Sequence, residues 1–412
     1  MSKFRPFRAI RPLPEDAKQV ASRPYDVLNS DEARLEAADN PISFLRVIKP
    51  EIDLPSDSDP YGEEVYRQGL AKLTEFKELG ILVQDPEAFF YVYRLTMDGR
   101  TQTGIVGCCD YQEYYDGSIK KHELTRTAKE NDRVRHVETQ NANAEPVFFS
   151  YRGKPGIDSL VNEVTRSPIE YDFVAEDGIR HELWVVRDRR LIENFESGFA
   201  EVPALYVADG HHRTAAAARV GQIRKEDNSD HTGEEEYNFF MAVLFPDDQL
   251  KIFDYNRVVR DLNGLSQESF LSAIKQSFEI SAIDGELAPT EKGTFSMYLG
   301  GVWYRLKANK EKLTSSPKEG LDVTYLSDEV LEPILGISDL RNDLRIDFVG
   351  GIRGLGELER RVDSGEMAVA FALFPVSMEE LLAIADAGEI MPPKTTWFEP
   401  KLRSGLFIHD LE

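Results

Sequence analysis

Residues 206–221, YVADGHHRTAAAARVG, constrain the fold more than any other stretch of this 412-residue chain. The opening apolar run is typical of a strand, Asp-Gly is a turn signal, and the alanine run favours a helix. A helix so rich in alanine can lie close to a sheet. The pattern therefore predicts a strand, a tight turn and a helix that begins near His211.

The start of such a helix is a natural binding site for an anion. Its first backbone N–H groups lack partners within the helix and carry partial positive charge. Gly210 lets the backbone approach a ligand, and the planar guanidinium of Arg213 suits phosphate oxygens. His211 and His212 can exchange protons near neutral pH. Asp209, at the edge of this site, could hold Mg²⁺ or orient a histidine.

Two other interpretations fit the same residues. Asp209 could simply cap the helix, with the histidines as half-buried polar residues. A zinc site is disfavoured because adjacent helical residues point about 100° apart, and no His-x-x-x-His or Cys-x-x-Cys pattern occurs. The adjacent Cys108 and Cys109 are expected to be small strand residues rather than a disulfide or metal ligands.

The charge of the chain disfavours whole classes of partner. Asp and Glu number 73 against 49 Lys and Arg, for a formal net charge of −24. So acidic a chain, with no long basic run, repels nucleic acids and anionic membranes. No stretch approaches the roughly 18 apolar residues of a spanning helix, and no signal peptide is evident. We expect a cytoplasmic protein; its oligomeric state is not determined by the sequence.

The periodicity along the chain predicts an α+β fold with two domains, or one with large insertions. Helices are expected from a cap at Asn29 or Ser30 to Ala38, over 61–80, within 122–145, from His211 to about Gly221, and within 261–278, with an acidic loop at 224–237. Strands are expected at 43–48, 88–97, 101–115, 146–151, 170–177, 180–188, 202–209 and 238–245.

Five motifs together resemble the family called domain of unknown function 1015. They are ADGHHRTAAAA in the opening stretch, RPYDV at 23–27, NPISFLRV at 40–47, GSIKKHELT at 117–125 and MPPKTTWFEPKLRSGL at 391–406. The resemblance implies a ParB/sulfiredoxin-like nucleotide-binding core, similar to free-serine kinases. We expect that core at 85–260, with an N-terminal elaboration at 1–84 and an α+β region at 261–412 packed on the core.

The same resemblance implies a catalytic base. Free-serine kinases have a His-Glu pair upstream of the turn, and His122 and Glu123 match it, although the segment up to Asp209 is longer here. From the residues alone, Glu123 is an ordinary exposed glutamate at a helix start. Sulfiredoxin chemistry needs a cysteine where this turn has His211, and ParB proteins have a DNA-binding helix-turn-helix that is not evident here.

Other side chains could line the same site. These weaker candidates are Arg23, Tyr25, Asp26, Lys129, Asp132, Arg133, Lys394, Thr395, Thr396 and Lys401. The predicted function is phosphoryl transfer from a nucleotide such as ATP or ADP, or from a polyphosphate, with Mg²⁺, to a small hydroxylated metabolite such as serine. The alternatives are a non-catalytic nucleotide sensor and a phosphohydrolase with the same phosphate site.

Overall fold

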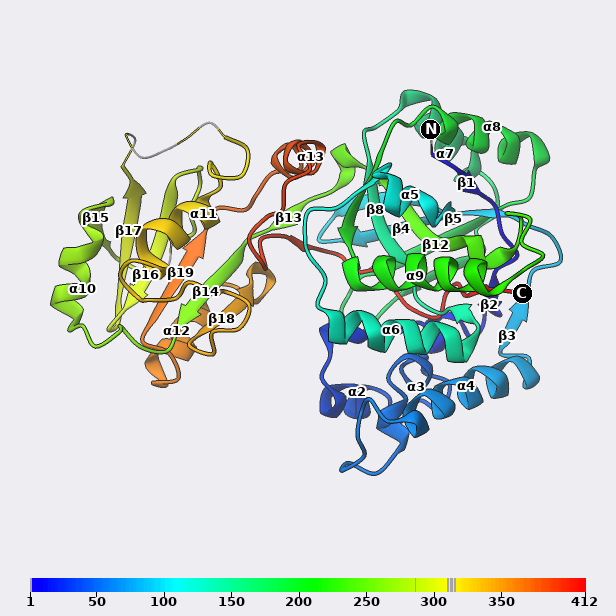
Figure 1. Cartoon of the computed structure of the whole chain (residues 1–412), viewed down its shortest axis with the longest axis horizontal. Coiled ribbons are helices and arrows are strands. Elements are labelled where there is room, and N and C mark those ends of the chain that lie inside the picture. The colour runs from blue at the N-terminus through cyan, green and yellow to red at the C-terminus, as the bar shows by residue number, and fades with distance from the viewer. Residues whose placement is uncertain (1, 286, 310, 312–313, 315) are drawn as a thin grey trace. The chain divides into compact units, whose positions relative to one another are not determined.

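The chain forms two compact units, shown in Figure 1 as a computed structural model. The first comprises residues 1–250 and 400–412, and the second comprises residues 251–399. This division differs from the predicted boundaries at 84/85 and 260/261, because the N-terminal segment and the last residues belong to the first unit. The structure describes residues 2–285, 287–309, 311, 314 and 316–412.

A nine-stranded mixed sheet forms the centre of the first unit. In spatial order the strands are β6 (Ile119–Lys120), β11 (Leu205–Asp209), β8 (Val147–Tyr151), β12 (Phe239–Pro246), β5 (Arg100–Asp110), β4 (Phe90–Met97), β10 (Arg180–Val186) and β9 (Tyr171–Val174), with β1 (Phe4–Arg5) also on β5. The pairs β6–β11 and β8–β12 are parallel and the others antiparallel. Two short pairs, β2 (Ile10–Pro12) with β3 (Leu82–Gln84) and β7 (Ala142–Asn143) with β21 (His409–Asp410), lie outside this sheet.

Helices lie on this sheet in successive layers (Figure 1). Helix α9 (His211–Asp227) contacts β8, β11 and β12, α6 (Thr127–Gln140) packs on α9, and α4 (Glu63–Glu78) packs on α6. The run Ala215–Ala218 is buried, which confirms that the alanines bring α9 close to the sheet. The remaining helices are α1 (Ala17–Val20), α2 (Ser30–Glu36), α3 (Leu45–Ile48), α5 (Gln112–Asp116), α7 (Pro155–Val164) and α8 (Arg189–Ala200).

Several local predictions are confirmed. The α+β class holds, and of the two predicted caps for α2 the structure has Asn29, which forms a reciprocal capping box with Glu32. The strands expected at 88–97 and from 101 are present as β4 and β5, joined by a hairpin that turns at Asp98 and Gly99, whose φ angles are +51° and +75°. Cys108 and Cys109 are free, fully buried strand residues, and burial raises the pKa of both thiols.

The strand expected at 101–115 ends at Asp110, and Gln112–Asp116 forms helix α5 instead. Two further predictions of secondary structure are wrong for identifiable reasons. Residues 43–48 do not form a strand; a short apolar run is ambiguous between buried strand and helix, and Leu45–Ile48 is the buried helix α3. Helix α9 does not end near Gly221 but continues to Asp227, so the acidic stretch from 224 begins as helix. A Cβ at Gly221 would lie 2.7 Å from the Tyr111 ring, so this glycine permits close packing rather than ending the helix.

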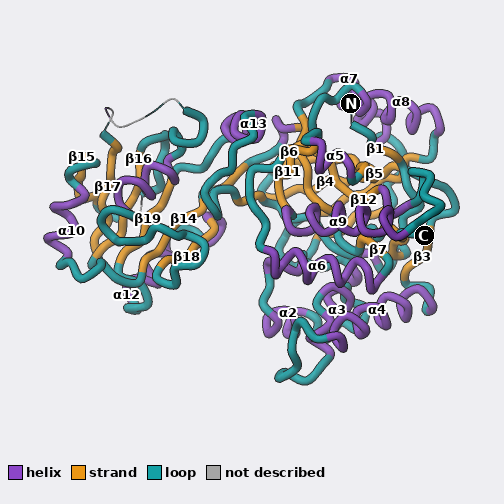
Figure 2. Tube along the Cα trace, in the orientation of Figure 1, coloured by secondary structure: helices purple, strands orange, loops and turns teal. Residues whose placement is uncertain are grey.

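The second unit has a six-stranded antiparallel sheet. Its strands in spatial order are β15 (Phe278–Ile283), β17 (Val302–Ala308), β16 (Thr294–Leu299), β19 (Val369–Leu373), β14 (Tyr255–Val259) and β18 (Ile346–Gly350). Figure 2 shows this sheet with its helices, which are α10 (Gln267–Ile274), α11 (Asp322–Leu326), α12 (Gly356–Asp363) and α13 (Met378–Asp386). The short pair β13 (Ile252–Phe253) and β20 (Trp397–Phe398) completes the unit. Across the described ranges, no helix has the length and apolar character needed to cross a bilayer.

Two glycine substitutions test the packing of the large sheet. On β5, a Cβ at Gly107 would lie 2.6 Å from the Phe4 ring and 2.8 Å from the Arg5 carbonyl oxygen. We expect Gly107→Ala to lower the free energy of unfolding by about 1–3 kcal/mol, as overpacking does. Gly156→Ala, in α7 with open space around it, should raise it by about 0.5–1 kcal/mol. Urea titrations followed by circular dichroism measure both, and equal midpoints for the two variants would contradict this packing.

Candidate functional site

The parallel pairing of β6 with β11 brings two distant motifs together. Ile119 pairs with Leu205, and Lys120 with Tyr206. Because parallel strands end at the same edge of a sheet, the segment after β6 lies beside the turn after β11. The rings of His122 and His211 are in contact there, with centroids 4.4 Å apart and planes at 90°.

The turn between β11 and α9 depends on Gly210. Its φ of +87° lies in the left-handed region, which glycine adopts without steric cost. A Cβ at this position would lie 3.2 Å from the guanidinium carbon of Arg213, so that side chain folds back over the turn. Gly210 is itself the N-cap and no side chain caps α9. The interpretation of Asp209 as a simple helix cap is therefore wrong.

Arg213 and Lys401 neutralise the carboxylate of Asp209. Arg213 is buried; it donates to the Pro146 carbonyl oxygen at 2.6 Å, and its Nη2 lies 3.6 Å from Asp26 and 3.8 Å from Asp209. Lys401 Nζ lies 3.3 Å from Asp209. Burial acts to raise the pKa of Asp209, but Lys401 and Arg213 outweigh it and hold that pKa at about 2. Asp209 is therefore ionised at neutral pH.

A second group of charges lies behind the turn. Arg133 of α6 donates to Asp132 at 2.9 and 2.7 Å, lies 3.6 Å from Glu145, and stacks 3.8 Å from the centre of the Tyr25 ring. Glu145 accepts hydrogen bonds from the Tyr25 backbone N–H at 3.2 Å and the Ser404 hydroxyl at 3.1 Å. Segments from the N-terminus, from α6 and from the C-terminus thus meet around one buried glutamate.

The two contacting histidines are neutral at physiological pH. Burial lowers the pKa of His211 to about 4, and burial together with the His211 charge lowers that of His122 to about 3. A neutral imidazole can accept or donate a hydrogen bond but adds no positive charge for a phosphate. His212 differs, since its Nε2 accepts a hydrogen bond from the Arg126 backbone N–H at 3.0 Å.

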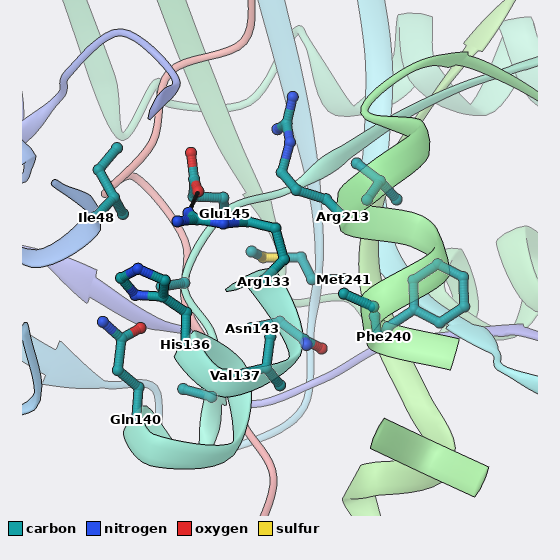
Figure 3. Close-up of a pocket in the computed structure, with 15 residues that line it drawn as sticks. Ile48, Arg133, His136, Val137, Gln140, Asn143, Glu145, Arg213, Phe240 and Met241 are labelled. Carbon is teal, nitrogen blue, oxygen red and sulfur yellow. Dashed lines mark ion pairs between the residues drawn. The ribbon is translucent and has the colours of Figure 1, made fainter. Parts of the chain in front are cut away.

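A cavity of about 40 Å³ lies between α6, α9 and the sheet. Figure 3 shows the ion pair of Arg133 with Glu145 beside this cavity, with Arg213, His136 and Gln140 also on its wall. A buried water needs roughly 10–15 Å³ of such space, so the cavity has room for a few waters and not for a nucleotide. A nucleotide therefore does not fit inside this cavity.

Some predicted site residues have other partners, and two of them belong to the other unit. Arg23 pairs with Glu36, and Lys129 donates to the Tyr61 hydroxyl at 3.2 Å. Lys394 and Thr395 belong to the second unit. Glu123 directly follows His122, and its charge opposes, without overcoming, the effect of burial on the pKa of that histidine. The role of Glu123 as a base stays a prediction. The candidates that do lie together are Tyr25, Asp26, His122, Asp132, Arg133, Asp209, Gly210, His211, Arg213 and Lys401.

The sequence analysis missed two charged residues of the site. Lys121 lies between β6 and His122, its Nζ is 3.9 Å from the centre of the Tyr114 ring, and its charge lowers the pKa of His211. Its place beside His122 in one motif was an available signal. Glu145 has no local signal, because its importance comes from partners that are distant in sequence.

A metal cage does not form around the turn. Within the described part of the chain, no group of three or more His, Cys, Asp or Glu side chains is placed to hold a metal ion. Mg²⁺ bound to a nucleotide needs only one or two protein carboxylates, since phosphates and waters supply the rest. Asp209 fits that smaller requirement, in competition with Lys401.

Comparison with known proteins identifies the family. The pattern described as "Protein of unknown function (DUF1015)" matches residues 4–324. The chain belongs to the DUF1015 family. The predicted membership is thus confirmed over most of the chain. A search with this DUF1015 sequence finds no match among curated proteins.

Solved structures similar to this DUF1015 protein are remote. A conserved hypothetical protein from Pyrococcus furiosus is 15% identical, with 73% of this chain and 93% of that chain covered and a TM-score of 0.34. A free serine kinase in complex with AMP is 14% identical, with 73% and 90% covered and a TM-score of 0.35. C-terminally truncated SbnI from Staphylococcus aureus is 11% identical, with 74% and 86% covered and a TM-score of 0.40. Similarity this low supports no argument about activity.

The buried histidines predict acid sensitivity. An unfolded histidine has a pKa of about 6.5, whereas His211 has a pKa of about 4 when folded, so the unfolded chain binds more protons between these values. The free energy of unfolding is therefore unaffected by His211 above about pH 6.5. It decreases as the pH falls toward 4, by on the order of 3 kcal/mol in total. Urea titrations at pH 7 and 5 measure this slope. His211→Gln should reduce it and the control His231→Gln should not; equal slopes in all three proteins would contradict the prediction.

Proposed function

We propose that this protein transfers a phosphoryl group from a nucleotide or polyphosphate to the hydroxyl of a small metabolite such as free L-serine. The single observation that supports this most is the contact of the His122 and His211 rings, which joins the His-Glu pair to the glycine turn. In this proposal the His-Glu pair and the glycine turn belong to a ParB/sulfiredoxin-like core at residues 85–260, and Asp26 and Lys401 complete the site from outside that range. Phosphoryl transfer needs little beyond positioning, charge neutralisation and a base, and these segments provide candidates for each.

The phosphate site in this proposal is the start of α9. Backbone N–H groups of the first turn point at the anion, and Lys121 and Lys401 supply positive charge beside it. Arg213 is enclosed by the Pro146 carbonyl, Asp26 and Asp209. It therefore fixes the shape of the turn as well as adding charge. The proposed phosphate site depends on Arg213 both for its shape and for its positive charge.

Glu123 is the proposed base. The acceptor hydroxyl oxygen forms a new bond to phosphorus as its proton passes to the Glu123 carboxylate. The bond from phosphorus to the bridging oxygen of the donor breaks, and the donor leaves with that electron pair. Mg²⁺ carried by the nucleotide would neutralise phosphate charge, with Asp209 as its protein carboxylate. His211, neutral and buried beside His122, remains available as a hydrogen-bond partner to the reacting groups.

Two other activities would use the same phosphate site. A nucleotide sensor needs the anion site but no base, and a phosphohydrolase replaces the metabolite with water. Turnover with free serine separates the kinase from both. Nucleotide binding without any turnover favours the sensor, and phosphate release without a phosphorylated acceptor favours the hydrolase.

Arg213 should be required for nucleotide binding. We expect Arg213→Ala to weaken ADP binding by about 1.5–3 kcal/mol, the usual loss for a charged hydrogen bond. Arg219→Ala, at a half-buried position on the same helix that pairs with Glu130, is the matched control and should bind as the wild type does. Isothermal titration calorimetry measures both variants, with circular dichroism to verify folding. Unchanged ADP affinity in folded Arg213→Ala would refute the proposed phosphate site at the start of α9.

Glu123 should be required for transfer but not for binding. Glu123→Gln keeps the shape and removes the basicity, so ADP should bind normally while transfer falls by roughly 10²–10⁴. Phosphorus NMR with ATP, Mg²⁺ and L-serine follows phosphoserine formation. Glu138→Gln, at an exposed position of α6, is the control for the charge change. Full turnover by Glu123→Gln would eliminate this residue as the base.

A further inference from the structure

Arg257 is a buried cation that has no carboxylate partner among the residues that the structure describes. It lies on β14 of the second unit and is 1% exposed. One terminal nitrogen donates to the Tyr255 carbonyl and the other to the Pro393 carbonyl oxygen at 3.4 Å, while its Nε–H finds no acceptor among the described residues. Burial lowers the pKa of Arg257 to about 9.

The other buried arginines of the chain are treated differently. Each forms an ion pair with a carboxylate: Arg11 with Asp85, Arg133 with Asp132, Arg213 with Asp26, Arg361 with Asp347 and Arg403 with Asp177. No ion pair of Arg257 occurs in the described ranges. A guanidinium removed from water needs a compensating negative charge, because carbonyl dipoles repay only part of its lost hydration. Arg257 therefore lacks a partner that the fold provides elsewhere.

The motif at 391–406, which the proposed transfer site uses only through Lys401 and Ser404, covers this arginine. Pro393 is half-buried, its carbonyl oxygen makes the long contact with Arg257, and the next residue, Lys394, is exposed. The residue that contacts the guanidinium is thus followed directly by an exposed one. Lys394 has a φ of +58°, and its Nζ lies 5.7 Å from the centre of the Tyr255 ring, next to Arg257 on the same strand. Two cations therefore approach the same short segment.

We infer that Arg257 and Lys394 bind an anionic group, a phosphate or a carboxylate, which replaces the Pro393 carbonyl at the guanidinium. Such a group supplies the charge that Arg257 lacks, and its oxygens suit the fork of guanidinium donors better than a single carbonyl does. Displacement of Pro393 requires no movement of a helix or strand, because residues 389–396 form a loop. All these residues lie within the second unit, so the inference is independent of the proposed transfer site.

A tryptophan near the site allows a local test on the full-length protein. The chain has three tryptophans, and the Trp397 ring lies 5.1 Å from that of Tyr255. Labelling with 5-fluorotryptophan gives fluorine resonances, of which Trp397 is assigned through Trp397→Phe. Inorganic phosphate and sodium acetate are titrated separately at constant ionic strength, with chloride as the reference. We expect a saturable shift of the Trp397 resonance and none for Trp184, which lies in the first unit.

Variants distinguish a built site from general salt effects. We expect Arg257→Lys, which keeps the charge but not the fork of donors, to weaken anion binding about tenfold, and Lys394→Gln to weaken it severalfold. Lys275→Gln, an exposed lysine of the same unit, should bind as the wild type does. Saturation by phosphate alone or by acetate alone supports the site and identifies the ligand class. Absence of a saturable Trp397 shift with both anions, or wild-type binding by both Arg257→Lys and Lys394→Gln, overturns the inference.

Discussion

The parallel pairing of β6 with β11 is the constraint on which the candidate site depends. It comprises only two residue pairs, extended by the hydrogen bond from the Leu205 N–H to the Ser118 carbonyl at 2.9 Å. Parallel strands must be joined by a long connection. Here that connection contains other strands of the sheet and helices that cover it. Because both strands end at one edge, His122 and His211 meet despite their distance in sequence. A catalytic proposal for this chain rests on that geometry.

Buried charge fixes the rest of the site around this edge. Arg213 joins the N-terminal segment, through Asp26, to the turn at Asp209, and Glu145 joins Tyr25 to Ser404 near the C-terminus. A buried ion pair stabilises little by itself, but a missing partner is costly, so each member specifies the position of the others. Motifs that are distant in sequence therefore lie together because each buried charge needs a partner from another segment.

The sequence predicts what is local and fails where partners are distant. The strand, turn and helix around Gly210 follow from neighbouring residues, as does the capping box of Asn29. The wrong predictions are due to tertiary packing. The apolar run at 43–48 contains the buried helix α3 rather than a strand, and Gly221 packs against Tyr111 instead of ending a helix. In the site, the turn and its histidines could be predicted from pattern and resemblance. The importance of Glu145 could not, since it arises from side chains brought by three separate segments.

A net charge of −24 does not conflict with the binding of anions. Charges exposed to solvent are screened within about 8–10 Å at physiological ionic strength, whereas buried charges act through a medium of lower polarisability. We therefore expect the acidic excess to repel extended polyanions, which must approach many surface carboxylates at once. In the proposed site, a single phosphate at the start of α9 would be affected mainly by the few cations nearest to it, among them Lys121 and Lys401. Overall charge thus restricts the size of an anionic ligand far more than its sign.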